Sequence, residues 1–139
     1  PTMLDYKIHI AKDSMFNTPP VFSIYVSMLT MRWLKKNGGV NWIEKVNQQK
    51  AELLYQTIDN SSIFEGSANI EDRSTMNATF LLTNTELEEE FNNMCANGGI
   101  NGLKGHRSVG GYRASMYNAM PFNSVQTLVE IMNELERKG

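Results

Sequence analysis

The segment that decides the fold is Thr75-Met76-Asn77-Ala78-Thr79-Phe80-Leu81-Leu82. Its apolar side chains at Met76, Ala78, Phe80 and Leu82 alternate with the polar residues Thr75, Asn77 and Thr79. A repeat of two residues is typical of a strand that buries one face. The segment therefore predicts a half-buried strand within a sheet.

The residues after this strand predict a short helix, two more strands and a final helix. Residues 85–88, Thr-Glu-Leu-Glu, have the spacing of a reciprocal helix cap, and two glycines at 98–99 end that helix. Residues 100–104 and 111–117 have the pattern of strands around a glycine-rich turn. An amphipathic repeat then predicts the last helix, through Val125, Leu128, Val129, Met132 and Leu135.

The residues before the strand predict a helical hairpin. Asn17 and Thr18 can cap a helix over residues 19–36, with two prolines in its first turn. This helix is apolar around most of its circumference, so we expect it to pack on several sides. Glycines end it, and a second capping pattern begins a helix over residues 41–58.

Together these elements predict an α/β fold of the α+β kind, with the order αα-βαββ-α. Residues 1–16 are expected to form an extended N-terminal segment, and residues 59–73 a polar connection. We expect one domain over residues 1–139, with a mainly antiparallel sheet of three to four strands and helices packed on one face.

The composition argues against several classes of partner. Thirteen basic and fifteen acidic side chains give a net charge of −2, so no overall positive field attracts nucleic acid or an anionic membrane. The single cysteine, Cys95, cannot form an internal disulfide, and no Cys/His group has the spacing of a zinc site. We expect a cytoplasmic protein with no metal and no membrane span. From the start at Pro1 we also expect an upstream segment.

The candidate site is the segment from Lys104 to Ser115, in which cations and glycines are concentrated. Glycines let backbone N–H groups approach a ligand, while a histidine and two arginines supply donors that suit phosphate and carboxylate oxygens. If residues 111–117 form a strand, Arg113 projects to the face opposite Tyr112. The segment predicts an anion site, although its residue types are also those of a glycine turn with solvated charges.

The other candidate residues give weaker evidence of a functional site. Residues 102–105 have the GxxG spacing of a nucleic-acid clamp, but they lead into a strand and the net charge opposes that function. His9 has no acid or nucleophile at a useful spacing. Lys12 is a conceivable Schiff-base lysine, but it stands beside Asp13 in a polar loop. No lysine has the apolar surroundings that lower a pKa.

Three segments carry a family resemblance: Lys12–Pro20 reads KDSMFNTPP, Arg73–Asn77 reads RSTMN, and Leu103–Pro121 reads LKGHRSVGGYRASMYNAMP. In their order and spacing they resemble the phosphoserine aminotransferase family, over essentially all 139 residues and at the end of that family's chain. The family consists of homodimeric class-V, fold-type I enzymes that use pyridoxal phosphate. The resemblance implies amino transfer between glutamate and 3-phosphohydroxypyruvate in serine biosynthesis, and in many bacteria also a role in pyridoxine biosynthesis.

The resemblance also implies roles for five residues. Asn17 and Thr18 correspond to the pair that reaches the cofactor phosphate of the opposite subunit. Arg113 corresponds to the arginine that holds the substrate α-carboxylate, and His106 with Arg107 corresponds to the contacts with the substrate phosphate. A substrate with both groups needs two separated cationic anchors, while the cofactor serves as electron sink.

In that family the catalytic lysine and the large cofactor-binding domain lie upstream of the part that this chain resembles. We therefore expect this chain to be the small C-terminal domain, to contact the large domain and a second subunit, and to be inactive alone. Tyr112 is a small departure, because methionine or another apolar residue is expected there. The alternative is a stand-alone α/β module that binds a phosphorylated metabolite, and the upstream reading frame discriminates the two hypotheses.

Overall fold

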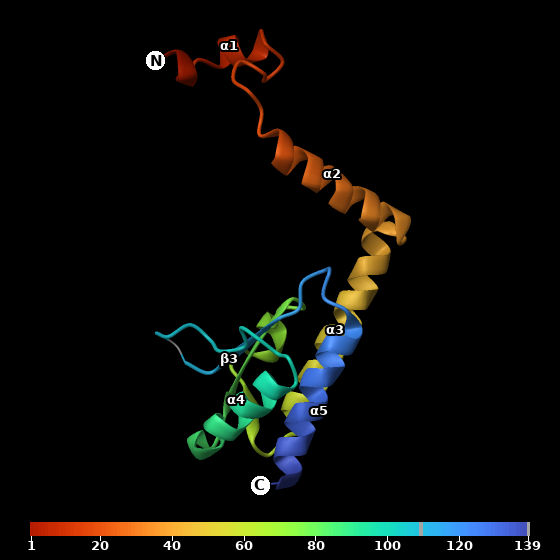
Figure 1. Ribbon diagram of the computed structural model, residues 1–139, viewed down its shortest axis with the longest axis vertical. Coiled ribbons are helices and arrows are strands. Elements are labelled where there is room, and N and C mark those ends of the chain that lie inside the picture. The colour runs from red at the N-terminus through yellow and green to blue at the C-terminus, as the bar shows by residue number, and fades with distance from the viewer. Residues whose placement is uncertain (109, 139) are drawn as a thin grey trace. The chain divides into compact units, whose positions relative to one another are not determined.

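The computed structural model describes residues 1–108 and 110–138 (Figure 1). The chain divides into two compact units, residues 1–40 and residues 41–139, and each is described by itself. The first unit holds a 3-10 helix η1 (Thr2–Leu4) and two α-helices, α1 (Tyr6–Ile10) and α2 (Val21–Lys36).

The N-terminal segment is helical, so the prediction of an extended segment over residues 1–16 is wrong. The side chain of Asp5 caps α1, because its Oδ1 accepts a hydrogen bond from the N–H of Lys7 at 3.0 Å. This cap stabilises the helical conformation, whereas the weak alternation of the sequence had favoured an extended chain.

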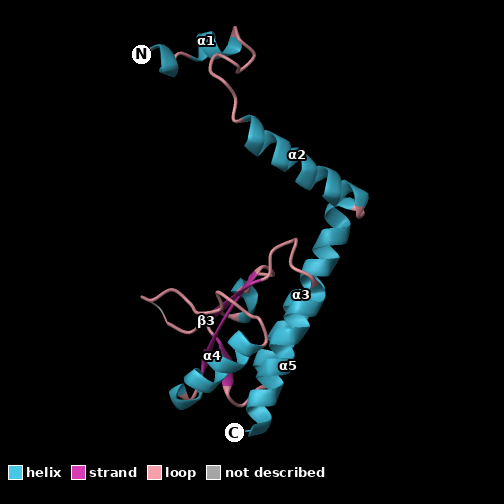
Figure 2. Cartoon of the chain, in the orientation of Figure 1, coloured by secondary structure: helices cyan, strands magenta, loops and turns pink. Residues whose placement is uncertain are grey.

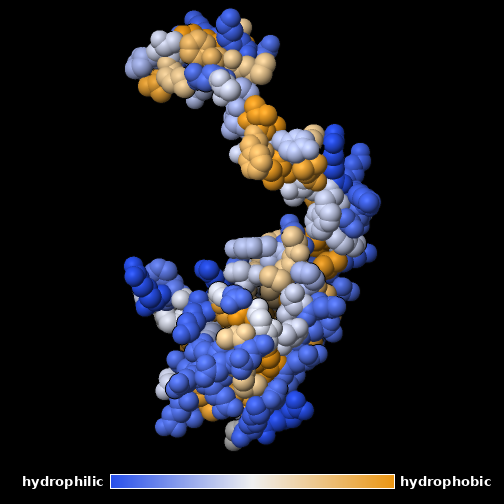
Figure 3. Space-filling view, viewed as in Figure 1, coloured by the Kyte–Doolittle hydropathy of each residue, from blue (hydrophilic) through white to orange (hydrophobic). Residues whose placement is uncertain are grey.

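Helix α2 begins at Val21, two residues later than predicted, because Pro20 occupies the capping position before the first turn. None of its 16 residues is buried in this unit, and Phe22 is 80% exposed. Figure 3 shows the resulting apolar surface in orange along the helix. The packing on several sides that its sequence predicts is therefore not provided by residues 1–40.

The second unit confirms the predicted fold class: an antiparallel sheet carries helices on one face (Figure 2). The sheet has the order β1-β2-β3, and its strands are β1 (Phe64–Gly66), β2 (Asn77–Leu82) and β3 (Tyr112–Ser115). The helices are α3 (Gly39–Asn60), which belongs to this unit from Asn41 onward, α4 (Glu88–Asn97) and α5 (Phe122–Lys138), with short 3-10 helices η2 (Ile70–Asp72) and η3 (Thr85–Leu87).

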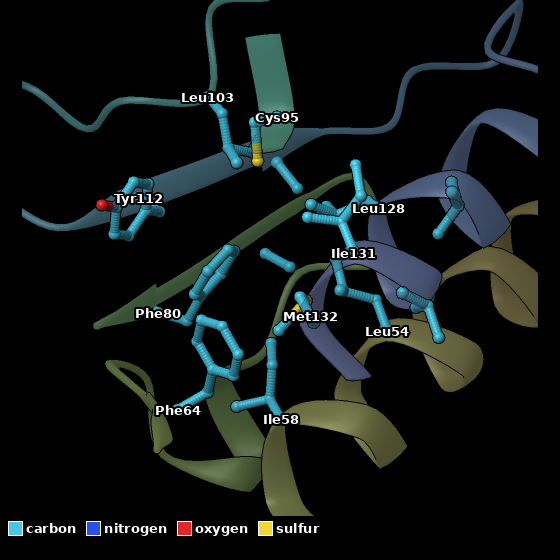
Figure 4. Close-up of a cluster of buried hydrophobic side chains, with 14 of the residues drawn as sticks. Leu54, Ile58, Phe64, Phe80, Cys95, Leu103, Tyr112, Leu128, Ile131 and Met132 are labelled. Carbon is cyan, nitrogen blue, oxygen red and sulfur yellow. The ribbon is translucent and has the colours of Figure 1, made fainter. Parts of the chain in front are cut away.

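The alternation predicted for the decisive segment is present in β2. Ala78 and Phe80 are fully buried and Leu82 is 7% exposed, whereas Leu81 points to the open face of the sheet and is 40% exposed. Phe80 pairs with Tyr112 across the ladder, and their rings stack with centroids 5.4 Å apart. Figure 4 shows Phe80 beside Phe64 on the side of the apolar side chains of α3 and α5, which close the core, with Tyr112 on the other side of Phe80.

The order of α-helices and strands is ααα-ββαβ-α; it differs from the predicted αα-βαββ-α by the additional N-terminal helix α1 and in two strands. Strand β1 was missed because three residues are too short to show a periodic pattern. The strand expected at residues 100–104 is reduced to one isolated bridge, between Lys104 and Tyr112. Gly102 has a φ of +72°, which bends the chain out of the extended conformation before a ladder can form.

Candidate anion site

The predicted anion-binding segment folds as a hairpin whose second arm is the edge strand β3. The N–H of Arg113 donates to the carbonyl of Leu103 at 2.7 Å, and the N–H of Gly105 donates to the carbonyl of Gly111 at 2.8 Å. Residues 103–105 therefore run beside residues 111–113, and His106 and Arg107 lie in the turn between them. Figure 3 shows hydrophilic residues gathered on the projecting loop that leads into the start of β3.

Two glycines allow the arms of the hairpin to approach so closely. A Cβ atom on Gly105 would overlap the carbonyl oxygen of Gly110 across the hairpin. Gly111 has a φ of +62°, and a Cβ there would lie 2.8 Å from the carbonyl oxygen of Phe80. The glycine-rich composition that drew attention to this segment is thus needed for its backbone geometry.

His106 and Arg107 are exposed at the turn. The Nδ1 atom of His106 lies 2.7 Å from the hydroxyl oxygen of Ser108 and accepts from the N–H of Ser108 at 3.3 Å. In the neutral imidazole an accepting Nδ1 leaves the proton on Nε2, so that nitrogen can donate to an anion. Val109, within the predicted segment, lies outside the described residues.

Arg113 lies on the open face of the sheet, as the strand alternation predicted. Its neighbours Tyr112 and Ala114 point into the core, whereas the Arg113 side chain is exposed. Arg113 also lines a pocket of about 370 Å³, together with Ser115, Met116, Met120, Val125 and Leu128. Within residues 1–108 and 110–138, no carboxylate forms an ion pair with this guanidinium. The group is therefore available to an anionic ligand.

Asn17 and Thr18 lie in the first unit, on the exposed connection between α1 and α2. The side-chain amide of Asn17 donates to the thioether sulfur of Met3, at 3.4 Å. A thioether is a weak acceptor, so this contact leaves the amide able to bind a stronger one. Asn17 and Thr18 belong to the first unit and the hairpin belongs to the second, so each is described by itself.

One buried cation was missed by the sequence reasoning. Lys50 on α3 is fully buried, and burial lowers the pKa of its ammonium group. The expectation that no lysine has a lowered pKa is therefore wrong. A signal was present, because Lys50 falls on the buried face of the helix, between Asn47 and Leu54 at a spacing of three and four residues.

The described residues also bear on metals and membranes. They contain no group of three or more His, Cys, Asp or Glu side chains that could hold a metal ion. None of the helices described is both long enough and apolar enough to cross a bilayer.

Comparison with known proteins gives the class of protein to which this chain belongs. The chain matches the family Aminotransferase class-V over residues 2–128, and it belongs to that family. Among curated proteins, it is 62% identical over 138 residues to the phosphoserine aminotransferase of Flavobacterium psychrophilum and 58% identical over 140 residues to that of Porphyromonas gingivalis. Each alignment covers 99% of this chain but only 39% of the relative's length.

Solved structures agree with the sequence comparison. The phosphoserine aminotransferase from Bacillus circulans subsp. alkalophilus superimposes with a TM-score of 0.90 at 43% identity, over 99% of this chain and 38% of that one. A phosphoserine aminotransferase of Trichomonas vaginalis, described as bound to pyridoxal phosphate, gives a TM-score of 0.83 at 36% identity over 96% of this chain and 38% of that one. At these identities the likeness extends beyond the fold to the family.

Proposed function

We propose that this chain is the small C-terminal domain of a phosphoserine aminotransferase, with residues 1–139 holding the substrate. The proposed reaction of the whole protein transfers an amino group between glutamate and 3-phosphohydroxypyruvate. The names of the relatives support this reaction, and they are similar over 99% of the chain. Because the chain spans 39% of the relatives' length, the activity of the whole protein is part of the proposal.

The observation that carries the proposal is the exposed guanidinium of Arg113 at a pocket of about 370 Å³, where no carboxylate of residues 1–108 and 110–138 forms an ion pair with it. A planar guanidinium can donate two parallel N–H bonds to a carboxylate, which a lysine cannot. His106 and Arg107 supply a second group of donors at the turn of the same hairpin. Two cationic groups separated along one hairpin suit a substrate with a carboxylate at one end and a phosphate at the other.

The cofactor implied by the family is pyridoxal phosphate, which supplies the electron sink for amino transfer. Asn17 and Thr18 would hold its phosphate, in the second subunit of a homodimer. The donors of this pair fit that role, because an exposed amide and a hydroxyl both donate to phosphate oxygens. We assign no catalytic lysine to this chain, because the resemblance places that lysine upstream and the buried Lys50 already donates to three backbone carbonyls.

The test is a comparison of arginine variants in the complete aminotransferase. Arg113→Lys should lower kcat/KM about thirtyfold to several thousandfold, since it loses the paired contact to the carboxylate. Arg137→Lys is the matched control, because Arg137 is exposed near the end of α5, away from the hairpin. Arg107→Ala should reduce turnover of phosphoserine far more than that of glutamate. Near-normal kcat/KM for both amino acids in Arg113→Lys contradicts the assignment.

A further inference from the structure

A buried ammonium group on α3 holds the segment that leads from β3 to α5. The Nζ atom of Lys50 donates to the backbone carbonyl oxygens of Met116 at 3.1 Å, Tyr117 at 2.9 Å and Met120 at 3.2 Å. An ammonium group has three donors and no acceptor, so these three carbonyls match its full capacity. The side chain is 0% exposed, and its ammonium group therefore donates to protein carbonyls rather than to solvent.

A second contact joins the same two elements. One turn before Lys50, the side-chain amide of Asn47 donates to the side-chain oxygen of Asn118 at 2.8 Å. The segment also closes on itself, because the N–H of Met120 donates to the carbonyl of Tyr117 at 2.9 Å. α3 thus fixes both the backbone and one side chain of residues 116–120.

The segment held in this way forms one wall of the pocket that Arg113 lines. Met116 and Met120 both line that pocket, and Lys50 binds the carbonyls of both. Met116 directly follows β3, and its N–H donates to the carbonyl of Met76 at 2.7 Å. Lys50 is therefore linked to the pocket through its hydrogen bonds to Met116 and Met120, and β3 connects Met116 to Arg113.

We infer that Lys50 is a positioning residue for the substrate pocket, which it shapes by fixing the carbonyls of Met116, Tyr117 and Met120. The inference rests on the proposed function, since it takes the pocket beside Arg113 as the substrate site. Burying a cation is costly, and an apolar side chain of similar length would fill the same space. What only the ammonium supplies is a single point that satisfies three converging carbonyls.

The first experiment measures the anchor itself, by hydrogen exchange in the 139-residue chain. In Lys50→Met, the amides of Met116 and Met120 should exchange at least about tenfold faster, while core amides of β2 stay protected. Lys45→Met is the matched control, because Lys45 is an exposed lysine on the same helix. Unchanged exchange at Met116 and Met120 overturns the inference, whatever reaction the protein catalyses.

The second experiment measures substrate binding in the complete aminotransferase. Lys50→Met should lower kcat/KM for phosphoserine about 10- to 100-fold, mostly through KM, because a displaced wall weakens binding in ground and transition states alike. Asn118→Ala changes an exposed position and should raise KM less than Lys50→Met does. It replaces Lys50→Met as the test variant if Lys50→Met does not fold. A purely structural role for Lys50 would lower stability and leave KM unchanged in both variants, and that result overturns the inference.

The two experiments separate failure of this inference from failure of the proposed function. If the wild-type enzyme transaminates phosphoserine and both variants keep its KM, only the role of Lys50 is wrong. If the wild-type enzyme does not transaminate phosphoserine at all, the proposed function is wrong, and the positioning role is lost with it.

Discussion

Phe80→Ala tests whether the aromatic cluster is the centre of the core. Phe80 is 0% exposed, and its ring centroid lies 5.8 Å from that of Phe64, 6.4 Å from that of Phe91 and 5.4 Å from that of Tyr112. Removing a buried phenylalanine ring costs about 3–5 kcal/mol. A unit of this size has a total stability of only about 5–15 kcal/mol. We therefore expect the variant to lose a substantial part of the stability of the unit.

The assay is urea unfolding of the chain, followed by circular dichroism. With a denaturant slope of about 1–3 kcal/mol per molar, the loss should lower the midpoint by about 2 M. Phe22→Ala is the matched control, because Phe22 is 80% exposed on α2 and its removal should change stability by less than about 0.5 kcal/mol. A midpoint shift below about 0.5 M for Phe80→Ala would refute the reasoning that places the core at this cluster.

Three further predictions concern acid, alkali and the cofactor. The hydrogen bonds from Arg73 hold the pKa of Asp59 below its usual value of 3.8, so the stabilisation from this pair is complete at neutral pH and disappears as the pH falls through that lowered pKa. Asp59→Asn should accordingly destabilise the protein at pH 7 and destabilise it less as the pH is lowered below 3.8, in unfolding curves over that pH range. Burial raises the pKa of Cys95 to about 11 and that of Tyr112 to about 12, so unfolding releases their protons and stability should fall as the pH rises above 9. The double variant Cys95→Ser/Tyr112→Phe should lose less stability over the same rise in pH. Finally, pyridoxal phosphate and borohydride should leave no stoichiometric adduct on one lysine of the chain by mass spectrometry, and such an adduct would contradict the assignment of the catalytic lysine to the rest of the protein.

The sequence by itself determined the elements that repeat over enough residues to show a period. β2 and α5 have long alternating or amphipathic patterns, and both are where the sequence predicts them. The position of Arg113 on the open face of the sheet also follows from alternation, since its neighbours Tyr112 and Ala114 are buried. The roles of Asn17, Thr18, His106 and Arg107 came from the family resemblance, because residue types alone do not separate an anion site from a solvated turn.

Only the tertiary structure decided which short segments pair and which charges are buried. β1 has three residues, so its place in the sheet depends on the neighbouring β2 rather than on its own sequence. Lys50 stands 66 residues from Met116 along the chain, and no local pattern records that three carbonyls converge on its ammonium group. Local propensity acts over a few residues, whereas the desolvation of a charge and the acceptors that compensate it depend on the folded neighbours of the side chain.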